Sequence, residues 1–147
     1  LHHDLGELMI RTCTIVRNNE DLAQAVEALN GLSERWKECN SLDISRARNQ
    51  SVVFINQLWN MIELAKVIAK GALLRDECRG SHYKPAFKLE QPKDVNSPEY
   101  KEFLAKWKEN NRKWLKTTIA QWTAEGPQIS YEEVDTSLIE PVPRRYD

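Results

Sequence analysis

The sequence has 147 residues, of which 41% are hydrophobic and 29% charged, and its formal net charge is -1. This balance is typical of a folded chain with one ordinary hydrophobic core and argues against a disordered polymer. The near-zero charge also argues against a nucleic-acid scaffold, which usually carries a clear basic excess.

Three cysteines, Cys13, Cys39 and Cys78, are far apart and form no CxxC pair. This spacing predicts neither a disulfide framework nor a zinc site, and it favours a reducing compartment. No uninterrupted apolar run approaches the roughly 18 residues that span a bilayer, so we expect no direct membrane insertion. The chain starts at Leu1 and enters helical periodicity at once, which we interpret as a piece of a longer polypeptide.

Apolar residues recur at helical spacing through most of the first 84 residues. They predict one helix over about 4–16 and a second, with Asn caps before it, over about 20–39. A third segment, 51–78, is apolar around most of its circumference and predicts the most buried helix. Three helices joined by short polar turns predict an up-and-down three-helix bundle, spectrin-repeat-like, over residues 1–84.

The pattern changes after Pro85, where a Pro-punctuated linker leads to Ser97 and Pro98, a cap and first-turn pair. The spacing of aromatic residues predicts an additional helix from there to about Trp122. The remaining residues, which alternate weakly, predict an extended C-terminal tail. We therefore expect an all-α fold in which residues 85–147 pack on the bundle to form one structural domain.

The stretch RDECRGSHY, residues 75–83, concentrates ionisable groups at the end of the third helix. Cys78 and His82 together suggest a metal site or a thiol and base pair, but no further ligands stand at a suitable spacing. A helix end explains more: Gly80 suits a left-handed terminating residue, and Arg75, Arg79 and His82 suit the negative end of the helix dipole. We prefer this helix cap, with Arg79 also reaching a neighbouring surface.

Lysines and tryptophans interleave in KWKENNRKWLKTT, residues 106–118, which could form a face for nucleic acid or acidic lipid. Because the tryptophans fall on one helical stripe and nearby glutamates balance the lysines, packing is the preferred interpretation. The sequence contains no GxGxxG, GxxxxGK[ST], HExxH or GxSxG motif. We expect no catalytic, cofactor-binding or metal-binding residue in this chain.

Several stretches carry a family pattern: LGELM, TIVRNNEDL, NMIELAKVIAKGALLRDECRGSHYKPAF, WLKTTIA, ISYEEVDTSLI and PRRYD. In this order they resemble the C-terminal portion of the flavoprotein subunit of succinate dehydrogenase and fumarate reductase, in its menaquinone-linked bacterial type. The family motif Glu-Ser-Arg-Gly-Ala-His-Tyr stands here over 77–83, with Cys78 and Ser81 replacing Ser and Ala. Residues 88–109 look like an insertion, and 110–113 lack the acidic run of many members.

The resemblance implies that the parent enzyme oxidises succinate to fumarate with FAD, and that an iron-sulfur subunit passes the electrons to quinone. It implies a part in electron transport and the tricarboxylic acid cycle, as a peripheral subunit at the cytoplasmic face of the bacterial inner membrane. The family's flavin and substrate residues lie upstream of this region, so none is assigned here. The implied partners are the flavin domain of the same chain and the iron-sulfur subunit.

We expect Arg79, Gly80, His82 and Arg144 to hold the bundle and tail against that flavin domain. Two alternatives remain open from the sequence. One is the related C-terminal domain of L-aspartate oxidase, although EEVDTSLI and RRYD favour the dehydrogenase. The other is a stand-alone helical interaction module with no enzyme attached.

Overall fold

A computed structural model describes residues 1–144. The last three residues of the predicted tail lie outside the described residues. In chain order the elements are α1 (His2–Cys13), α2 (Asn19–Trp36), α3 (Gln50–Leu74), η1 (Pro85–Phe87), α4 (Pro98–Trp114), β1 (Lys116–Gln121) and β2 (Gln128–Glu133). The described chain is mostly helical, with a small antiparallel sheet.

Polar side chains begin three of the α-helices as the sequence predicts. The carbonyl oxygen of the Asn18 side chain accepts a hydrogen bond from the Asp21 amide at 2.8 Å, at the start of α2. Asn49 caps α3 in the same way, and Ser97 caps α4 with Pro98 in the first turn. These side chains satisfy amides that have no partner within the helix, so they fix where each helix starts.

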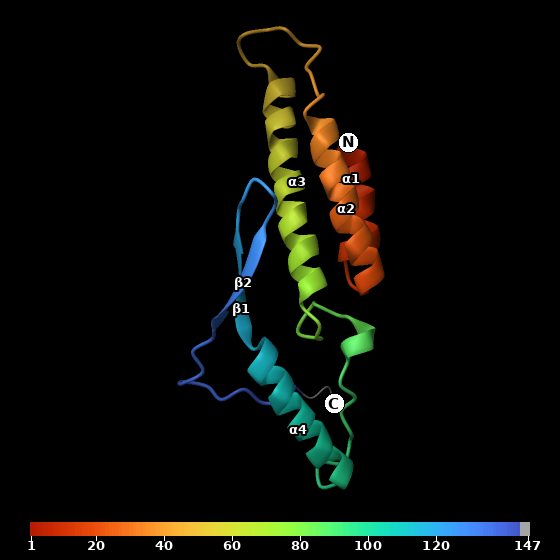
Figure 1. Ribbon diagram of the computed structural model, residues 1–147, viewed down its shortest axis with the longest axis vertical. Helices are drawn as coiled ribbons and strands as arrows, with labels where there is room; N and C mark the ends of the chain where they lie inside the picture. Colours follow the sequence, from red (N-terminus) through yellow and green to blue (C-terminus); the bar gives the residue numbers. More distant parts are fainter. Residues whose placement is uncertain (145–147) are drawn as a thin grey trace.

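The core lies among α1, α2 and α3, which pack side by side with α3 the longest (Figure 1). It consists mainly of leucines and alanines: Leu5, Leu8, Cys13, Leu22, Ala25, Leu29, Leu32, Leu58, Ile62, Ala65, Ala69 and Ala72. Alanines along α3 let α2 approach closely. Trp36 and Trp59 extend this contact with ring centroids 4.7 Å apart.

Both α1 and α2 begin and end within a few residues of their predicted bounds. α1 ends at Cys13 because the guanidinium of Arg17 donates to the Cys13 carbonyl, and Val16 pairs with Tyr83 in an isolated β-bridge. α2 ends at Trp36, followed by a tight turn through Cys39.

The all-α prediction is wrong in the C-terminal third, where a β-hairpin replaces the end of the predicted helix. α4 stops at Trp114, and β1 pairs with β2 in a register that sets Thr118 opposite Tyr131. The β-branched run Thr117, Thr118 and Ile119 favours a strand, and a turn closed by a bond from the Gly126 amide to the Thr123 carbonyl returns the chain. Figure 1 shows α4 beyond the end of α3 and the hairpin returning along α3.

α3 buries little of its apolar surface for so hydrophobic a helix. By length and composition it could cross a membrane, yet only 22% of its most apolar window is buried within the described chain. One such helix is weak evidence for a membrane span. The sequence predicts α3 to be the most buried helix, and this prediction is wrong because many of its apolar side chains are exposed.

Candidate docking site

Residues 75–84, which we call the corner segment, connect the end of α3 to the linker. The Arg79 amide donates to the His82 carbonyl at 2.9 Å, and the His82 amide donates back at 3.0 Å, so 79–82 form a tight hairpin turn. Gly80, with φ of +58°, occupies the first central position, as glycine does in a type II′ turn. The prediction that Gly80 ends the helix is therefore wrong.

The helix ends earlier because Lys84, rather than the predicted arginines, caps it. Its ammonium is almost fully buried and donates to the Leu73 carbonyl at 3.0 Å, which places a cation at the negative end of α3. The same ammonium forms an ion pair with Asp76 at 3.0 Å, and Asp76 accepts a bond from Asn19 at the start of α2. These bonds fix the corner segment to two helices.

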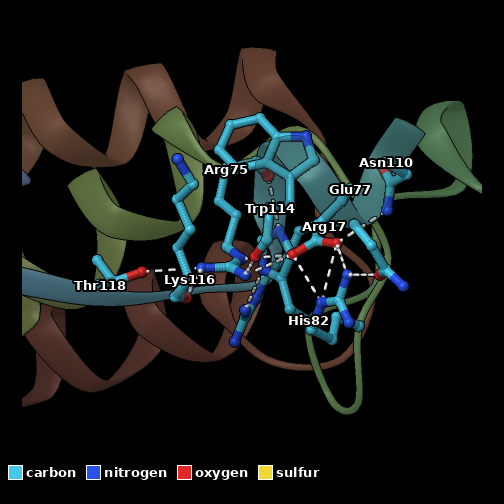
Figure 2. Close-up of polar contacts among 10 residues, drawn as sticks. Arg17, Arg75, Glu77, His82, Asn110, Trp114, Lys116 and Thr118 are labelled. Carbon is cyan, nitrogen blue, oxygen red and sulfur yellow. Dashed lines mark hydrogen bonds and ion pairs between the residues drawn. The ribbon is translucent and has the colours of Figure 1, made fainter. Parts of the chain in front are cut away.

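Glu77 is fully buried and lies between two arginines (Figure 2). Its carboxylate is 2.6 Å from the guanidinium of Arg75 and 2.9 Å from that of Arg79. Asn110 of α4 donates a further hydrogen bond of 3.1 Å to the same carboxylate. We call Arg75, Glu77 and Arg79 the Arg–Glu–Arg cluster; it supplies the buried anion with the partners that a desolvated charge requires.

Arg75 also joins the corner segment to the C-terminal third of the chain. Its guanidinium donates to the carbonyls of Trp114 and Lys116, the latter at 3.2 Å, and to the Thr118 hydroxyl at 3.0 Å (Figure 2). The Trp114 ring lies over the guanidinium, 5.8 Å from its carbon to the ring centroid. One side chain thus holds the end of α4 and the start of β1 against α3.

The Arg79 side chain contacts residues inside the molecule and is also partly exposed. Besides Glu77, it contacts Asn111 of α4, with 2.8 Å between its guanidinium nitrogen and the side-chain oxygen. Many members of the family that the sequence resembles have an acidic run at 110–113, and here the amides of Asn110 and Asn111 occupy that place. About a third of the Arg79 side chain remains exposed.

His82 connects the corner segment to the loop between α1 and α2. Its Nδ1 is 2.8 Å from the Arg17 guanidinium, and its Nε2 is 2.8 Å from the Arg75 carbonyl. Because an arginine can only donate and a carbonyl can only accept, these contacts assign the neutral tautomer with hydrogen on Nε2. Burial lowers the pKa of His82, and the nearby charges of Arg17, Lys84 and Arg75 lower it further.

The geometry does not support the thiol and base pair considered from the sequence. The Cys78 thiol donates to the Lys84 carbonyl at 3.0 Å, while both ring nitrogens of His82 are occupied by other partners. Within residues 1–144, no three His, Cys, Asp or Glu side chains gather as metal ligands would.

The four predicted docking residues, Arg79, Gly80, His82 and Arg144, all line one open hollow of about 980 Å³. The residues that line it come from the corner segment, the linker, α4 and the tail. The structure thus brings together residues that are far apart in the sequence.

Sequence reasoning missed Glu77, Arg17 and the two asparagines of α4. Glu77 had a usable signal: in an extended segment, residues two apart point to the same side, so Arg75, Glu77 and Arg79 share a face. The predicted helix over this segment hid that pattern. For Arg17 no local signal exists, because its contact with His82 spans 65 residues.

Comparison with known proteins relates nearly the whole chain to one family. Residues 2–146 match the family model described as fumarate reductase flavoprotein C-term. The succinate dehydrogenase flavoprotein subunit of Bacillus subtilis is 38% identical over 148 residues, which cover 99% of this chain and 22% of that protein. The fumarate reductase flavoprotein subunit of Haemophilus influenzae is 27% identical over 147 residues, covering 99% and 21%.

The fold agrees with this relationship. A solved Escherichia coli quinol fumarate reductase, carrying one substitution in its FrdA chain, matches with a TM-score of 0.74 and 25% identity over 94% of this chain and 21% of that chain. The chain spans about a fifth of the length of the relatives it matches. These matches confirm the resemblance seen in the sequence motifs, and the chain belongs to the family of fumarate reductase flavoprotein C-terminal domains.

Proposed function

We propose that the chain is the C-terminal helical part of a succinate dehydrogenase or fumarate reductase flavoprotein subunit, and that it serves docking rather than chemistry. The parent enzyme would oxidise succinate to fumarate with FAD and pass electrons through an iron-sulfur subunit to quinone. It would lie as a peripheral subunit at the cytoplasmic face of the bacterial inner membrane. Support comes from the family match over nearly the whole chain.

The described residues do not fit a flavin dinucleotide. The α-helices follow Leu1, Asn18, Asn49 and Ser97, and none begins after the glycine-rich turn that brings backbone amides to a pyrophosphate. We therefore propose that the FAD site lies in another portion of the parent chain.

The observation that carries the docking role is the exposed apolar surface of α1 and α3. Phe54, Met61 and Ile68 recur every seven residues on α3, and Leu64 lies beside them with 64% of its surface exposed. Met9 of α1 adjoins them across a shallow groove. We call these five residues the α1–α3 surface. A contiguous apolar patch of this kind marks an interface, and in the proposed parent chain we expect the flavin domain to cover it.

We propose that α1, α2 and α3 act as a three-helix bundle, and that residues 1–84 and 85–147 form one structural domain. The bonds of Arg75 to the end of α4 and to β1 support this unit. Within it, Arg79, Gly80 and His82 fix the turn, and Arg144 of the tail lines the same hollow, so that all four contribute to docking.

The test is made in the full-length subunit with Leu64→Glu, and Leu42→Glu serves as the matched control because Leu42 is 96% exposed in the loop after α2. Burying a leucine contributes about 1.5–3 kcal/mol, so Leu64→Glu should lower the thermal midpoint and release flavin. Leu42→Glu should leave both unchanged. Equal behaviour of the two variants would show that the α1–α3 surface is not the docking surface.

The corner segment has its own test, Arg79→Ala in the full-length subunit, read by flavin content, assembly with the iron-sulfur subunit and thermal stability. We expect losses in stability and assembly. If all three stay at the wild-type level, Arg79 has no docking role.

A further inference from the structure

The lining of the hollow beside the corner segment has more cations than anions, whereas the complete chain is nearly neutral. Among the described residues that line it, Arg79, Lys88, Lys93 and Arg144 are cations, and Glu90 alone is an anion. The complete chain has a net charge of -1, so this concentration is local. Glu77 behind the wall offsets Arg79 in part, and Glu90 pairs with Lys88 at 2.8 Å.

Lys93 stands apart from the other cations of the hollow. It is exposed at the rim and forms no ion pair with any residue that the structure describes. Pro92 restricts the backbone of the linker directly before it. A lysine placed in this way is available to a carboxylate from outside.

Aromatic side chains also line the hollow. Phe103 of α4 is buried, Trp107 of α4 is half-buried, and Phe87 of η1 is about one-third exposed. The hollow is open to solvent, and its volume of about 980 Å³ lies at the upper end of the range for small-molecule sites. A lining of aromatic side chains and cations is complementary to a polypeptide segment that carries carboxylates beside an apolar side chain.

We propose that this hollow receives an acidic segment of the same parent chain, from the portion that precedes Leu1. The proposal rests on the function proposed above and names the chemistry of one contact. The uncovered part of the relatives is on the order of 500 residues, which as a compact body has a radius of gyration of about 23 Å. Leu1 precedes α1, which is about 18 Å long, and Arg17 beyond the other end of α1 contacts His82 of the corner segment. A body of this size therefore reaches from Leu1 to the corner segment.

The experiment places the photo-crosslinking residue p-benzoylphenylalanine at position 93 of the full-length subunit in its assembled complex. Lys106, exposed on α4 and outside the hollow, is the matched control position. A crosslink from position 93, but not from 106, to a carboxylate-bearing segment of the same chain is the expected result. No crosslink, a crosslink to another subunit, or one to a segment without carboxylates would overturn the proposal.

A charge reversal then tests whether the contact is ionic. Position 90 carries the reporter in this second series because Lys93 is changed to Glu, and the crosslink yield should fall roughly two- to fivefold, the range for an exposed ion pair. Changing the contacted carboxylate to lysine in the same chain should restore the yield. Unchanged yield in Lys93→Glu, or no recovery in the paired variant, would refute the ionic contact.

A reporter at position 64 separates this proposal from the general docking role. If position 64 crosslinks to the preceding portion of the chain while position 93 does not, the docking function stands and the acidic contact is wrong. If neither position crosslinks, both are wrong.

Discussion

Replacing Glu77 with Gln removes the carboxylate that Arg75 and Arg79 share while keeping the size of the side chain. The Gln amide can accept from one guanidinium, but its NH₂ group then faces the donors of the other. Two guanidinium groups would be left near a fully buried site without their counter-charge. We expect a large loss of folding free energy from a single change of charge.

The size of the loss follows from the burial of the cluster. Removing one partner of a buried ion pair costs about 3–5 kcal/mol. Here Arg75 is 14% exposed and Arg79 34% exposed, so solvent screens part of the remaining charge and the lower figure of about 3 kcal/mol applies. For a chain of this length, that corresponds to a fall of about 10 °C in the thermal midpoint.

Urea unfolding followed by tryptophan fluorescence measures this quantity, because Trp114 lies against Arg75. The control is Glu109→Gln, an exposed position on α4, which should change the free energy of unfolding by less than about 0.5 kcal/mol. If Glu77→Gln unfolds within that margin of the control, the Arg–Glu–Arg cluster does not stabilise the fold as argued.

Two further predictions concern the turn. The pKa of His82 lies below its ordinary 6.5, so the unfolded chain binds the proton more readily than the folded chain. The contribution of His82 to stability is therefore full above pH 6.5 and declines as the pH falls through the folded pKa. His82→Gln should flatten that decline in unfolding curves taken from pH 7.5 to 5, whereas exposed His3→Gln should not. At both Gly80 and Gly71 an added Cβ meets no other atom, so the backbone conformation decides the effect of alanine. Gly80→Ala should destabilise the fold by about 1–2 kcal/mol because the φ of Gly80 is +58°. Gly71→Ala inside α3 should stabilise it by about 0.5–1 kcal/mol. A shared sign in urea unfolding would contradict the backbone argument.

The helices could be predicted from the sequence because local signals determine them. Asn18, Asn49 and Ser97 stand where caps are needed, and the leucines of α1 and α2 follow the helical period. The hairpin could not be predicted with equal ease. Trp114 continues the aromatic stripe of α4, so the helical periodicity hides the β-branched residues at 117–119 that favour a strand. The bonds of Arg75 that hold this region are long-range and leave no local signal.

The candidate site was predicted in its residue types but not in its geometry. Arg79 and His82 are part of it, and the resemblance to the flavoprotein family supplied the expectation of docking. Periodicity placed both residues at a helix end, however, where they would point outward. Their inward contacts with Glu77 and Arg17 depend on tertiary packing, and only the alternation of charge at 75, 77 and 79 hinted at them.

The bonds of Arg75 have a consequence for how the molecule opens. α4 and the hairpin have little packing against α1 and α2, and Arg75 supplies three of the bonds that attach them to the end of α3. The Trp122 indole adds a hydrogen bond of 2.8 Å to Glu63 further along α3. Fraying of the last turn of α3 would loosen the end of α4 and the start of β1 together. Amide hydrogens of Thr118 and of the end of α3 should therefore exchange with deuterium at a common opening free energy, as members of one cooperative unit.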